Sequence, residues 1–426
     1  MRVLWLTNTP VGASGVLNIK GHAGGWMSSL EKHIKNVEGV ELAVCFFYNK
    51  QDKFKFTHNL VTYYPVKDKN ARLISKIRNR FFNRLSDRNR AGLQKVILDF
   101  KPDIIQLFGT ESGLGEIIID TEVPVIVHIQ GLINPILAAW FPKGIAQSTV
   151  LLNSPVLSIL SNKGFFGYYY LLKKTAKREE AIIKSAQYFL GRTEWDKRVV
   201  KLYNTQCTYF HCDELLRPVF FKNRWVLKKN PVLKIITCFN PVIYKGIEIV
   251  LETAVILRRL THLKFEWSII GVTEKNDLVR LVEKVKKSTF RENNVFFKGF
   301  KLEDELVNEL LNSHVFIHPS HIDNSPNSVC EAMLIGMPVI AGNVGGVPSL
   351  MEHNVSGILY NSYDPYELAG IILEKAKNPE ELRALGENAR ETALKRHDPD
   401  TIVSTIVHAY DMVTKSVKEP EIFTSQ

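Results

Sequence analysis

The sequence contains no long apolar run and only a few cysteines. None of its uninterrupted apolar stretches reaches the roughly 18 residues that a membrane-spanning helix requires. The five cysteines are scattered and odd in number, and Cys207 and Cys212 lack partners at zinc-ligand spacing. We therefore expect neither a disulfide scaffold nor a metal site, and a reducing cytoplasm is the simplest compartment.

A signal peptide and low-complexity segments are also missing. The first strand-like residues, up to Pro10, turn polar too early for a secretory leader, so we expect a strand that leads into a loop. Hydrophobic residues make up 45% of the chain and charged residues 23%, which is close to the globular average and excludes a disordered or collagen-like protein. At roughly 150 residues per domain, 426 residues predict two or three domains.

Positive charge is concentrated in one segment. The net charge is +11, and residues 67–90 hold nine basic and two acidic side chains. Leu73, Ile77, Phe81 and Leu85 recur every four residues within it, which predicts a basic amphipathic helix. The helix either packs its apolar stripe into the core or docks on an anionic membrane surface. Nucleic-acid binding is not expected, because neither a recognition fold nor interleaved aromatic residues accompany the charge.

Short apolar runs alternate with segments of helical periodicity along the whole chain. Runs that are apolar on both faces are typical of buried parallel strands, and their alternation with helices predicts right-handed βαβ units and an α/β fold. The expected strands are Val3–Leu6, Leu42–Phe47, Ile104–Phe108, Val123–Ile129, Leu233–Cys238, Phe265–Ile270, Val295–Phe297, Val315–His318 and Pro338–Ala341.

This pattern starts twice, at the N-terminus and again at Leu233, after a basic stretch. We therefore predict two Rossmann-like domains, residues 1–228 and 229–400, that face a ligand-binding cleft at the carboxyl ends of their strands. The last segment, residues 401–426, has helical spacing. It either continues the second domain or crosses back to the first. The segment His211–Glu214 is expected to be an interdomain loop.

The stretch from His318 to Ala341 is the most informative part of the sequence. A strand is expected to end near His318, and a helix to begin at Asn327 or Ser328 after a polar loop. The backbone amides at such a helix N-terminus suit a diphosphate.

Two acids, Asp323 and Glu331, bracket this turn. Carboxylates at this place can accept hydrogen bonds from sugar or ribose hydroxyls. The alternative is that Asp323 or Ser325 caps the helix and that Glu331 is an ordinary first-turn acid.

The pattern resembles the signature of retaining GT-B glycosyltransferases of family 4, the glycosyl transferases group 1. The resemblance rests on the spacing of the two acids, on Glu-Ala-Met at 331–333 and on Gly-Met-Pro-Val-Ile-Ala at 336–341. It is strong over about residues 230–400 and looser before residue 228, and it implies the two-domain GT-B fold. Further matching segments are Lys245-Gly246, Lys298-Gly299, the run 345–359, Gly24-Gly25-Trp26, Pro102-Asp103 and His128.

The resemblance implies several roles in donor binding. Glu331 corresponds to the acid that binds the nucleotide ribose, and Lys245 to the lysine that holds the donor diphosphate. Asp323 stands beside the transferred sugar, where the family usually has glutamate. Asn240 occupies a position where the family often has arginine, and Lys298 is a candidate replacement for that missing cation. Further donor-binding residues are expected at Ser325, Asn327, Ser328, Gly24 and Gly25.

In the N-terminal half, the resemblance places His128 next to the reacting carbon of the donor sugar. A core histidine and an ordinary tight turn remain the alternatives for His128 and for the glycine loop. Glu111 and Arg192 each follow an expected strand, which suits an acceptor-side role. A helix-terminal position is the alternative for Glu111, and Thr193 is expected to cap a helix. The aromatic run Phe165–Leu172 is a core segment, an acceptor-site wall or an interfacial anchor.

The implied function is transfer of a sugar, with retention, from a nucleotide-sugar donor to a glycan acceptor such as a lipid-linked glycan. His128, Asp323 and Lys245 are the expected catalytic residues. No metal or other cofactor is expected. The protein would work in surface polysaccharide or glycoconjugate synthesis, in the cytoplasm or at the inner membrane face. A non-catalytic nucleotide-sugar- or glycan-binding protein, or a nucleotide-sugar epimerase, on the same fold remains the alternative.

Overall fold

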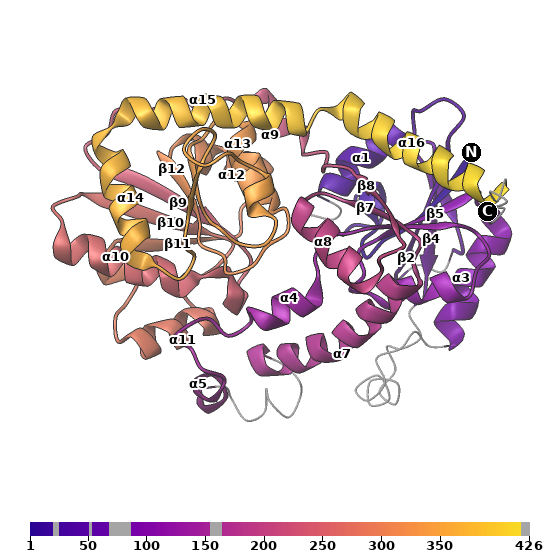
Figure 1. The fold of residues 1–426 in the computed structure, drawn as a ribbon, viewed down its shortest axis with the longest axis horizontal. Helices are drawn as coiled ribbons and strands as arrows, with labels where there is room; N and C mark the ends of the chain where they lie inside the picture. The colour runs from indigo at the N-terminus through magenta and orange to yellow at the C-terminus, as the bar shows by residue number, and fades with distance from the viewer. Residues whose placement is uncertain (20–24, 51–52, 68–86, 154–163, 419–426) are drawn as a thin grey trace, which may run out of the picture. The chain divides into compact units, whose positions relative to one another are not determined.

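The computed structural model describes residues 1–19, 25–50, 53–67, 87–153 and 164–418, and the chain divides into two compact units. The first comprises Met1–Ile133, Lys173–Leu215 and the segment from His397 onward, and the second comprises Asn134–Leu172 and Leu216–Arg396. Each unit is built around one sheet with helices on both faces (Figure 1). The α/β class predicted from the sequence is therefore confirmed. The predicted basic helix around Leu73–Leu85 lies outside the described residues.

The first unit contains an eight-stranded sheet in the order β3-β4-β2-β1-β5-β6-β7-β8. Its neighbouring strands pair in parallel, except that β3 and β4 form an antiparallel edge. The strands are β1 (Arg2–Leu6), β2 (Glu41–Phe47), β3 (Phe56–His58), β4 (Val61–Val66), β5 (Ile104–Phe108), β6 (Val125–His128), β7 (Tyr188–Gly191) and β8 (Thr208–His211).

Helices cover both faces of this sheet. Apolar side chains of α1 and α16 pack on one face, and those of α3, α7 and α8 pack on the other. The helical segments are η1 (Val11–Ala13), α1 (Trp26–Ile34), α3 (Asp87–Phe100), η3 (Gly113–Ile119), α7 (Gly164–Ser185), α8 (Glu194–Tyr203) and α16 (Pro399–Lys418).

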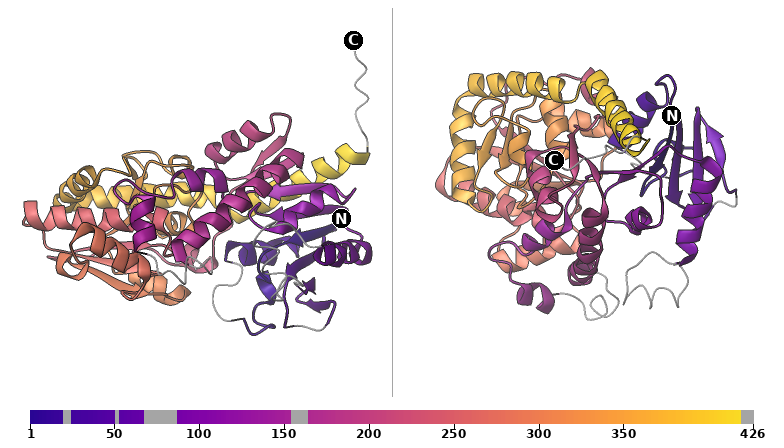
Figure 2. Two further views of the ribbon diagram at one scale, coloured as in Figure 1. Left: turned by 90° about the horizontal axis from the view of Figure 1, so that it is seen from below. Right: turned by 45° about the vertical axis from the view of Figure 1, so that its right-hand side comes forward.

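The C-terminal helix α16 belongs to the core of the first unit. Ile402, Ile406, Tyr410 and Val413 are the helically spaced residues of the sequence, and they are buried against the apolar residues of β1, β2 and β5. The helix lies beside α1 and can be followed in yellow in Figure 2. Of the two alternatives for this segment, the structure selects the one in which it returns to the first unit.

The second unit contains a six-stranded sheet in the order β11-β10-β9-β12-β13-β14, with all neighbours parallel. Helices α10, α11 and α14 pack on one face, and α9, α12, α13 and α15 on the other (Figure 1). The strands are β9 (Leu233–Cys238), β10 (Phe265–Ile270), β11 (Val295–Gly299), β12 (Val315–His318), β13 (Val339–Gly342) and β14 (Ile358–Tyr360).

The remaining helical segments of the described residues follow in sequence order. They are α4 (Ile133–Ala138), α5 (Gln147–Leu152), α9 (Pro218–Lys222), η4 (Ile243–Lys245), α10 (Ile247–Leu260), α11 (Asp277–Lys286), η5 (Arg291–Asn293), α12 (Glu303–Leu311), α13 (Asn327–Leu334), η6 (Val347–Ser349), α14 (Pro365–Lys377) and α15 (Pro379–Arg396). Within the described residues, no helix combines the length and apolar character that crossing a membrane requires.

The segment 134–172 belongs to the second unit, although the sequence placed it in the N-terminal domain. Trp140 is fully buried in the core of that unit, with its ring 5.5 Å from the ring of Tyr244. Phe165, Tyr169 and Leu172 pack against the same core. One side of the aromatic run is therefore core, whereas Tyr168, Tyr170 and Leu171 are exposed.

The boundary between the units also differs from the predicted one near residue 228. The second unit resumes at Leu216. The segment between Leu216 and β9 packs on the sheet of the second unit and does not form a linker. Trp225 is buried there, and its indole Nε1 donates a hydrogen bond to the carbonyl of Ser313 (2.8 Å). Of the predicted interdomain loop 211–214, His211 instead ends strand β8 and pairs with Gly191, whereas residues 212–214 are loop residues that lead to the boundary after Leu215.

We predict that Trp140→Ala destabilises the second unit by about 3–5 kcal/mol, since it removes a large, fully buried side chain. Hydrogen exchange measured by mass spectrometry should show faster exchange in α10 and β9 than in the strands of the first unit. Leu152→Ala is the control, because Leu152 is 84% exposed. Equal acceleration in both units would contradict the assignment of residue 140 to the second unit.

Candidate functional site

In the second unit, an ion pair joins the two loops that follow β9 and β12. Lys245 lies at the end of η4, and Asp323 lies on the loop between β12 and α13. The Lys245 Nζ is 2.6 Å from Asp323 Oδ2, and each side chain is only 16% exposed. His318, the last residue of β12, donates from Nε2 to the same oxygen (2.9 Å). Thus two of the predicted catalytic residues, Lys245 and Asp323, are brought into direct contact, together with a histidine that the sequence analysis had not singled out.

The charges of this cluster follow from its surroundings. Burial raises the pKa of Asp323, but Lys245 and His318 outweigh this effect and hold the pKa well below its usual range. Burial lowers the pKa of His318, despite the opposing effect of Asp323. At neutral pH the cluster therefore consists of an ammonium, a carboxylate and a neutral imidazole that donates from Nε2.

Two glycines allow the backbone to close around Asp323. Gly246 has φ 74°, and a Cβ at this position would overlap the carbonyl oxygen of Pro319. Gly345 has φ 51°, and a Cβ there would overlap the carbonyl oxygen of Asp323, which also accepts a hydrogen bond from the Gly346 amide (2.9 Å). These contacts explain why the sequence has glycine at both positions, since a side chain would push the loops apart.

Glu331, the predicted ribose ligand, is held by an arginine that the sequence analysis missed. It lies in α13 and is buried, and its Oε1 accepts hydrogen bonds from Nε (2.9 Å) and Nη2 (2.7 Å) of Arg217. Nη1 of Arg217 also bonds to Glu303 (3.3 Å). Burial alone would lower the pKa of Arg217, but the carboxylates of Glu331 and Glu303 raise it by more than burial lowers it. The net effect is a raised pKa, so the guanidinium stays charged. Arg217 is 114 residues away from Glu331 in the sequence, and no local pattern marks this pairing.

The N-terminus of α13 is where the sequence predicted it. The helix begins at Asn327, and its N-cap residue is Pro326, which makes no side-chain capping bond. The N-cap position is therefore held by Pro326 and not by Asp323 or Ser325. Ser325 is buried next to this terminus, and Asn327 and Ser328 form the first turn.

Lys298 does not join the Lys245–Asp323 pair. It is an exposed residue of the edge strand β11, and β10 lies between β11 and β9. At a strand spacing of about 4.8 Å, this order separates the two strands by roughly 10 Å. Asn240 is also exposed. The structure therefore does not support Lys298 as the replacement for the missing arginine.

In the first unit, His128 ends strand β6 and is fully buried. Its ring packs against Phe108 (5.5 Å between ring centroids) and Trp26 (5.1 Å). Its Nδ1 is 2.9 Å from Nε2 of Gln106. Burial, reinforced by Arg192, lowers its pKa well below the usual value despite Glu214, so the imidazole is neutral at physiological pH.

Arg192 lies beside the same residues. Its guanidinium stacks on Trp26 at 4.4 Å, donates to Gln130 Oε1 (2.8 Å) and lies 3.9 Å from the carboxylate of Glu214. Only 3% of the side chain is exposed. The positive charge of the guanidinium is thus partly offset by the fully buried carboxylate of Glu214. Through its stacking on Trp26, Arg192 is also part of the packed interior of the first unit.

The other predicted residues of this unit are less closely grouped. Glu111 is exposed and folds its carboxylate over Gly109, beyond the end of β5. Gly25 has φ 48° and is the N-cap of α1, and Gly24 lies outside the described residues. The predicted cap is confirmed, since Thr193 Oγ1 accepts from the Asp196 amide (3.1 Å) at the start of α8.

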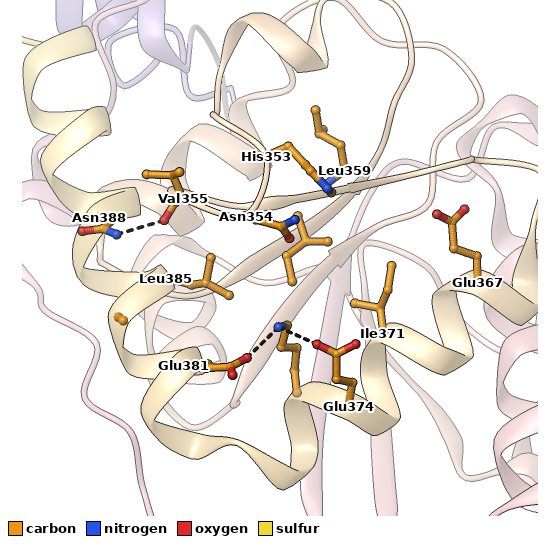
Figure 3. Close-up of a pocket in the computed structure, with 13 residues that line it drawn as sticks. His353, Asn354, Val355, Leu359, Glu367, Ile371, Glu374, Glu381, Leu385 and Asn388 are labelled. Atoms are coloured by element: carbon orange, nitrogen blue, oxygen red, sulfur yellow. Dashed lines mark hydrogen bonds and ion pairs between the residues drawn. The ribbon is translucent and has the colours of Figure 1, made fainter.

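A separate pocket of about 450 Å³ lies between β14, α14 and α15 (Figure 3). Its wall includes His353, Glu367 and Asn388, and Lys375 bridges Glu374 (2.8 Å) and Glu381 (2.6 Å) beneath it. None of the predicted site residues lines this pocket. Its lysine is also neutralised by two acids, so the pocket does not extend the site around Asp323.

Solved structures with the same fold cover nearly the whole chain. Sucrose-phosphate synthase from Thermosynechococcus elongatus superimposes with a TM-score of 0.71 over 98% of this chain and all of that one, at 13% identity. Anabaena HepE in complex with UDP-glucose gives a TM-score of 0.63 over 97% of this chain and all of that one, at 15% identity. The fold is therefore GT-B, as the sequence predicted.

Sequence similarity is concentrated in the second unit. Residues 220–392 match the family model of the glycosyl transferases group 1, the family whose signature the sequence resembles. The amylovoran biosynthesis glycosyltransferase AmsK of Erwinia amylovora is 33% identical over 135 residues, 30% of this chain and 32% of that protein. N-acetyl-alpha-D-glucosaminyl L-malate synthase of Bacillus anthracis is 29% identical over 136 residues, 32% of this chain and 35% of that protein. The chain thus spans about a third of the length of these curated relatives.

We predict that Lys245→Met lowers the free energy of unfolding by about 1.5–3 kcal/mol, because it leaves the carboxylate of Asp323 charged, partly buried and with only His318 as a hydrogen-bond donor from a side chain. Adding Asp323→Asn should recover most of this loss, giving a favourable coupling energy in a double-mutant cycle at pH 7. The control Lys298→Met, at an exposed position, should stay within about 0.5 kcal/mol of the parent. Additive effects of the two site substitutions would contradict the pairing.

The lowered pKa values of His128 and His318 predict that stability falls with acidification. Both groups take up protons near pH 6.5 in the unfolded chain but resist protonation when folded, so the unfolded state binds more protons. Their contribution is complete above about pH 6.5 and declines below it, by up to about 1.4 kcal/mol per pH unit for each histidine. Urea midpoints between pH 7.5 and 5.5 measure this slope. His128→Gln should flatten it, and an unchanged slope would contradict a buried neutral imidazole.

Proposed function

We propose that the protein transfers a sugar from a nucleotide-sugar donor to a glycan acceptor, with retention of the anomeric configuration. The observation that carries the proposal is the cluster in the second unit. A lysine, an aspartate and a buried glutamate gather near the N-terminus of α13, whose N-cap is Pro326, inside the segment that matches the glycosyl transferases group 1.

The donor would be held through its diphosphate and its ribose. The ammonium of Lys245 and the amides at the start of α13 suit the diphosphate, since both are preorganised donors of positive charge. Glu331, fixed by Arg217, accepts hydrogen bonds from the ribose hydroxyls. Asp323 is left to face the sugar, where its carboxylate accepts from a sugar hydroxyl.

The reaction breaks the bond between the anomeric carbon and the diphosphate and forms one to the acceptor oxygen. The acceptor hydroxyl proton passes to an oxygen of the leaving phosphate, and a nucleoside diphosphate leaves. Lys245 stabilises the charge that develops on this leaving group. Because the phosphate takes this proton, the acceptor oxygen lies on the face of the anomeric carbon that the phosphate leaves. The new bond forms on that same face, so the configuration is retained without a protein nucleophile. By resemblance, His128 contacts the donor sugar.

Relatives suggest the class of acceptor. One relative is named for amylovoran biosynthesis, and another, from Campylobacter jejuni, is named as an N-acetylgalactosaminyltransferase acting on a diphospho-undecaprenol-linked sugar. The Campylobacter protein is 26% identical over 205 residues, 47% of this chain and 50% of that one. We therefore propose a lipid-linked glycan as acceptor, reached from the cytoplasmic side of a membrane, with the basic segment 67–90 as the docking element.

Nucleotide binding is the first prediction of this proposal. In a thermal-shift titration without added metal, one nucleoside diphosphate among UDP, GDP and ADP should raise the melting temperature. At a concentration of 100 times Kd, the stabilisation is about 2.7 kcal/mol. UDP is tried first, because HepE was solved with UDP-glucose. Glu331→Gln should weaken binding about tenfold or more, since loss of a charged hydrogen bond costs roughly 1.5–3 kcal/mol.

The control is Glu367→Gln, which changes an acid at the separate pocket of Figure 3 and should leave nucleotide binding unchanged. Absence of a shift with every nucleotide, in a folded sample, would refute donor binding. Binding without sugar transfer or donor hydrolysis, even with membrane extracts as acceptor source, would favour a non-catalytic binding protein. Conversion of the donor in the absence of any acceptor would favour an epimerase.

A further inference from the structure

A chain of buried hydrogen bonds connects the C-terminal helix α16 to His128 within the first unit. Nε1 of Trp5 donates to the hydroxyl of Tyr410 (3.1 Å), and this hydroxyl bonds to Oε1 of Gln106. Nε2 of Gln106 in turn lies 2.9 Å from Nδ1 of His128. All four side chains are fully buried, so the described protein groups alone decide the direction of each bond.

The direction of the chain follows from its first member. An indole N–H can only donate, so the Tyr410 oxygen accepts from Trp5. The Tyr410 hydrogen is then available for Gln106, and it needs an acceptor, which is Oε1. The amide NH2 of Gln106 therefore points at His128 and donates to Nδ1. The opposite orientation of the amide would leave the Tyr410 hydrogen without an acceptor among the described residues.

The tautomer of His128 is thereby fixed. Its Nδ1 accepts a hydrogen bond and carries no proton, so the proton of the neutral ring lies on Nε2. This nitrogen is buried and makes no hydrogen bond to any described protein group. A buried donor without an acceptor costs about 1–3 kcal/mol, so its presence at the carboxyl end of β6 points to a ligand that supplies the acceptor.

We propose that Gln106 and Tyr410 are positioning residues that hold His128 as an Nε2–H donor to a hydroxyl oxygen of the donor sugar. The identity of the ligand rests on the proposed function, whereas the tautomer does not. Two charged groups, Arg192 and Glu214, lie near the ring of His128. Burial has a larger effect on the pKa of His128 than either of them, so the ring stays neutral. The helix α16, distant in sequence, therefore contributes to sugar recognition without touching the sugar.

The tautomer is tested directly by NMR of protein labelled with ¹⁵N-histidine, without substrate. Long-range ¹H–¹⁵N spectra separate protonated from bare ring nitrogens, and the signals of His128 are identified by their absence in His128→Gln. We expect a protonated Nε2 and a bare Nδ1 from pH 7.5 to 6. A protonated Nδ1, or an imidazolium at pH 6, would overturn the proposal whatever the protein's activity.

Tyr410→Phe tests the role of the chain in recognition. It removes the hydroxyl that orients Gln106, so both tautomers should appear in the spectrum. The affinity for UDP-glucose, or for the donor identified by screening, should fall in proportion to the fraction of His128 that keeps its proton on Nε2, which is about twofold when the two tautomers are equally populated. The affinity for the free nucleotide should not change, because the nucleotide has no sugar.

Tyr64→Phe is the matched control. Tyr64 is a buried tyrosine of the same unit whose hydroxyl bonds to Asp99 (2.6 Å), in a different cluster from His128. It should affect stability but neither the His128 spectrum nor sugar binding. Equal loss of nucleotide and nucleotide-sugar affinity in Tyr410→Phe would show a merely structural role for the chain and overturn the proposal. If no nucleotide binds to the parent protein, the proposed function fails, but the NMR result still stands.

Discussion

Parallel strand pairing is the constraint on which the site in each unit depends. In a parallel sheet, all strands end at the same edge, so residues that follow different strands meet there. In the second unit this rule brings together η4, which follows β9, and the loop that follows β12, and with them Lys245 and Asp323. In the first unit it places His128, the last residue of β6, near Arg192, which follows β7. The chemistry of both groups is thus a consequence of topology.

The close approach of the loops in the second unit requires a particular backbone as well. Gly246 and Gly345 sit on either side of the Asp323 loop, each with a positive φ and each in contact with a carbonyl oxygen. The short side chain of Asp323, in place of the glutamate usual in the family, can be understood within this arrangement. Its carboxylate is reached by both Lys245 and His318 without a longer side chain, and the two donors keep it ionised.

Features carried by local patterns were predictable from the sequence. Strands such as Ile104–Phe108 and Leu233–Cys238 are predominantly apolar runs, and the structure reproduces their bounds. The start of α13 at Asn327 and the Thr193 cap were predictable because capping and turn residues act within a few positions. The strands β3, β4, β8 and β14 were missed. Strands β3, β8 and β14 are three or four residues long and include polar or aromatic residues, and β4 contains Pro65, which argues against a strand.

Features that depend on distant partners were not predictable. Arg217 lies next to Glu331 because α9 packs on the same side of the sheet as α13, and nothing in the residues around Arg217 indicates that acid. The assignment of segment 134–172 to the second unit was not predictable either. The spacing of its apolar residues would suit the core of either unit. Trp140 is assigned by the aromatic partner that it meets outside this segment, Tyr244 of the second unit.

The charge balance of the second unit bears on how an anionic donor could bind. Lys245 is paired with Asp323, and Arg217 is paired with Glu331 and Glu303, so each of these two cations is already offset by acid. In the proposed donor complex, a diphosphate would share Lys245 with Asp323. Further attraction would come from the backbone amides at the start of α13, where the N-cap residue Pro326 makes no side-chain capping bond. Recognition of this kind depends on the geometry of the loop more than on net charge, which is why the two glycines beside Asp323 matter as much as the lysine.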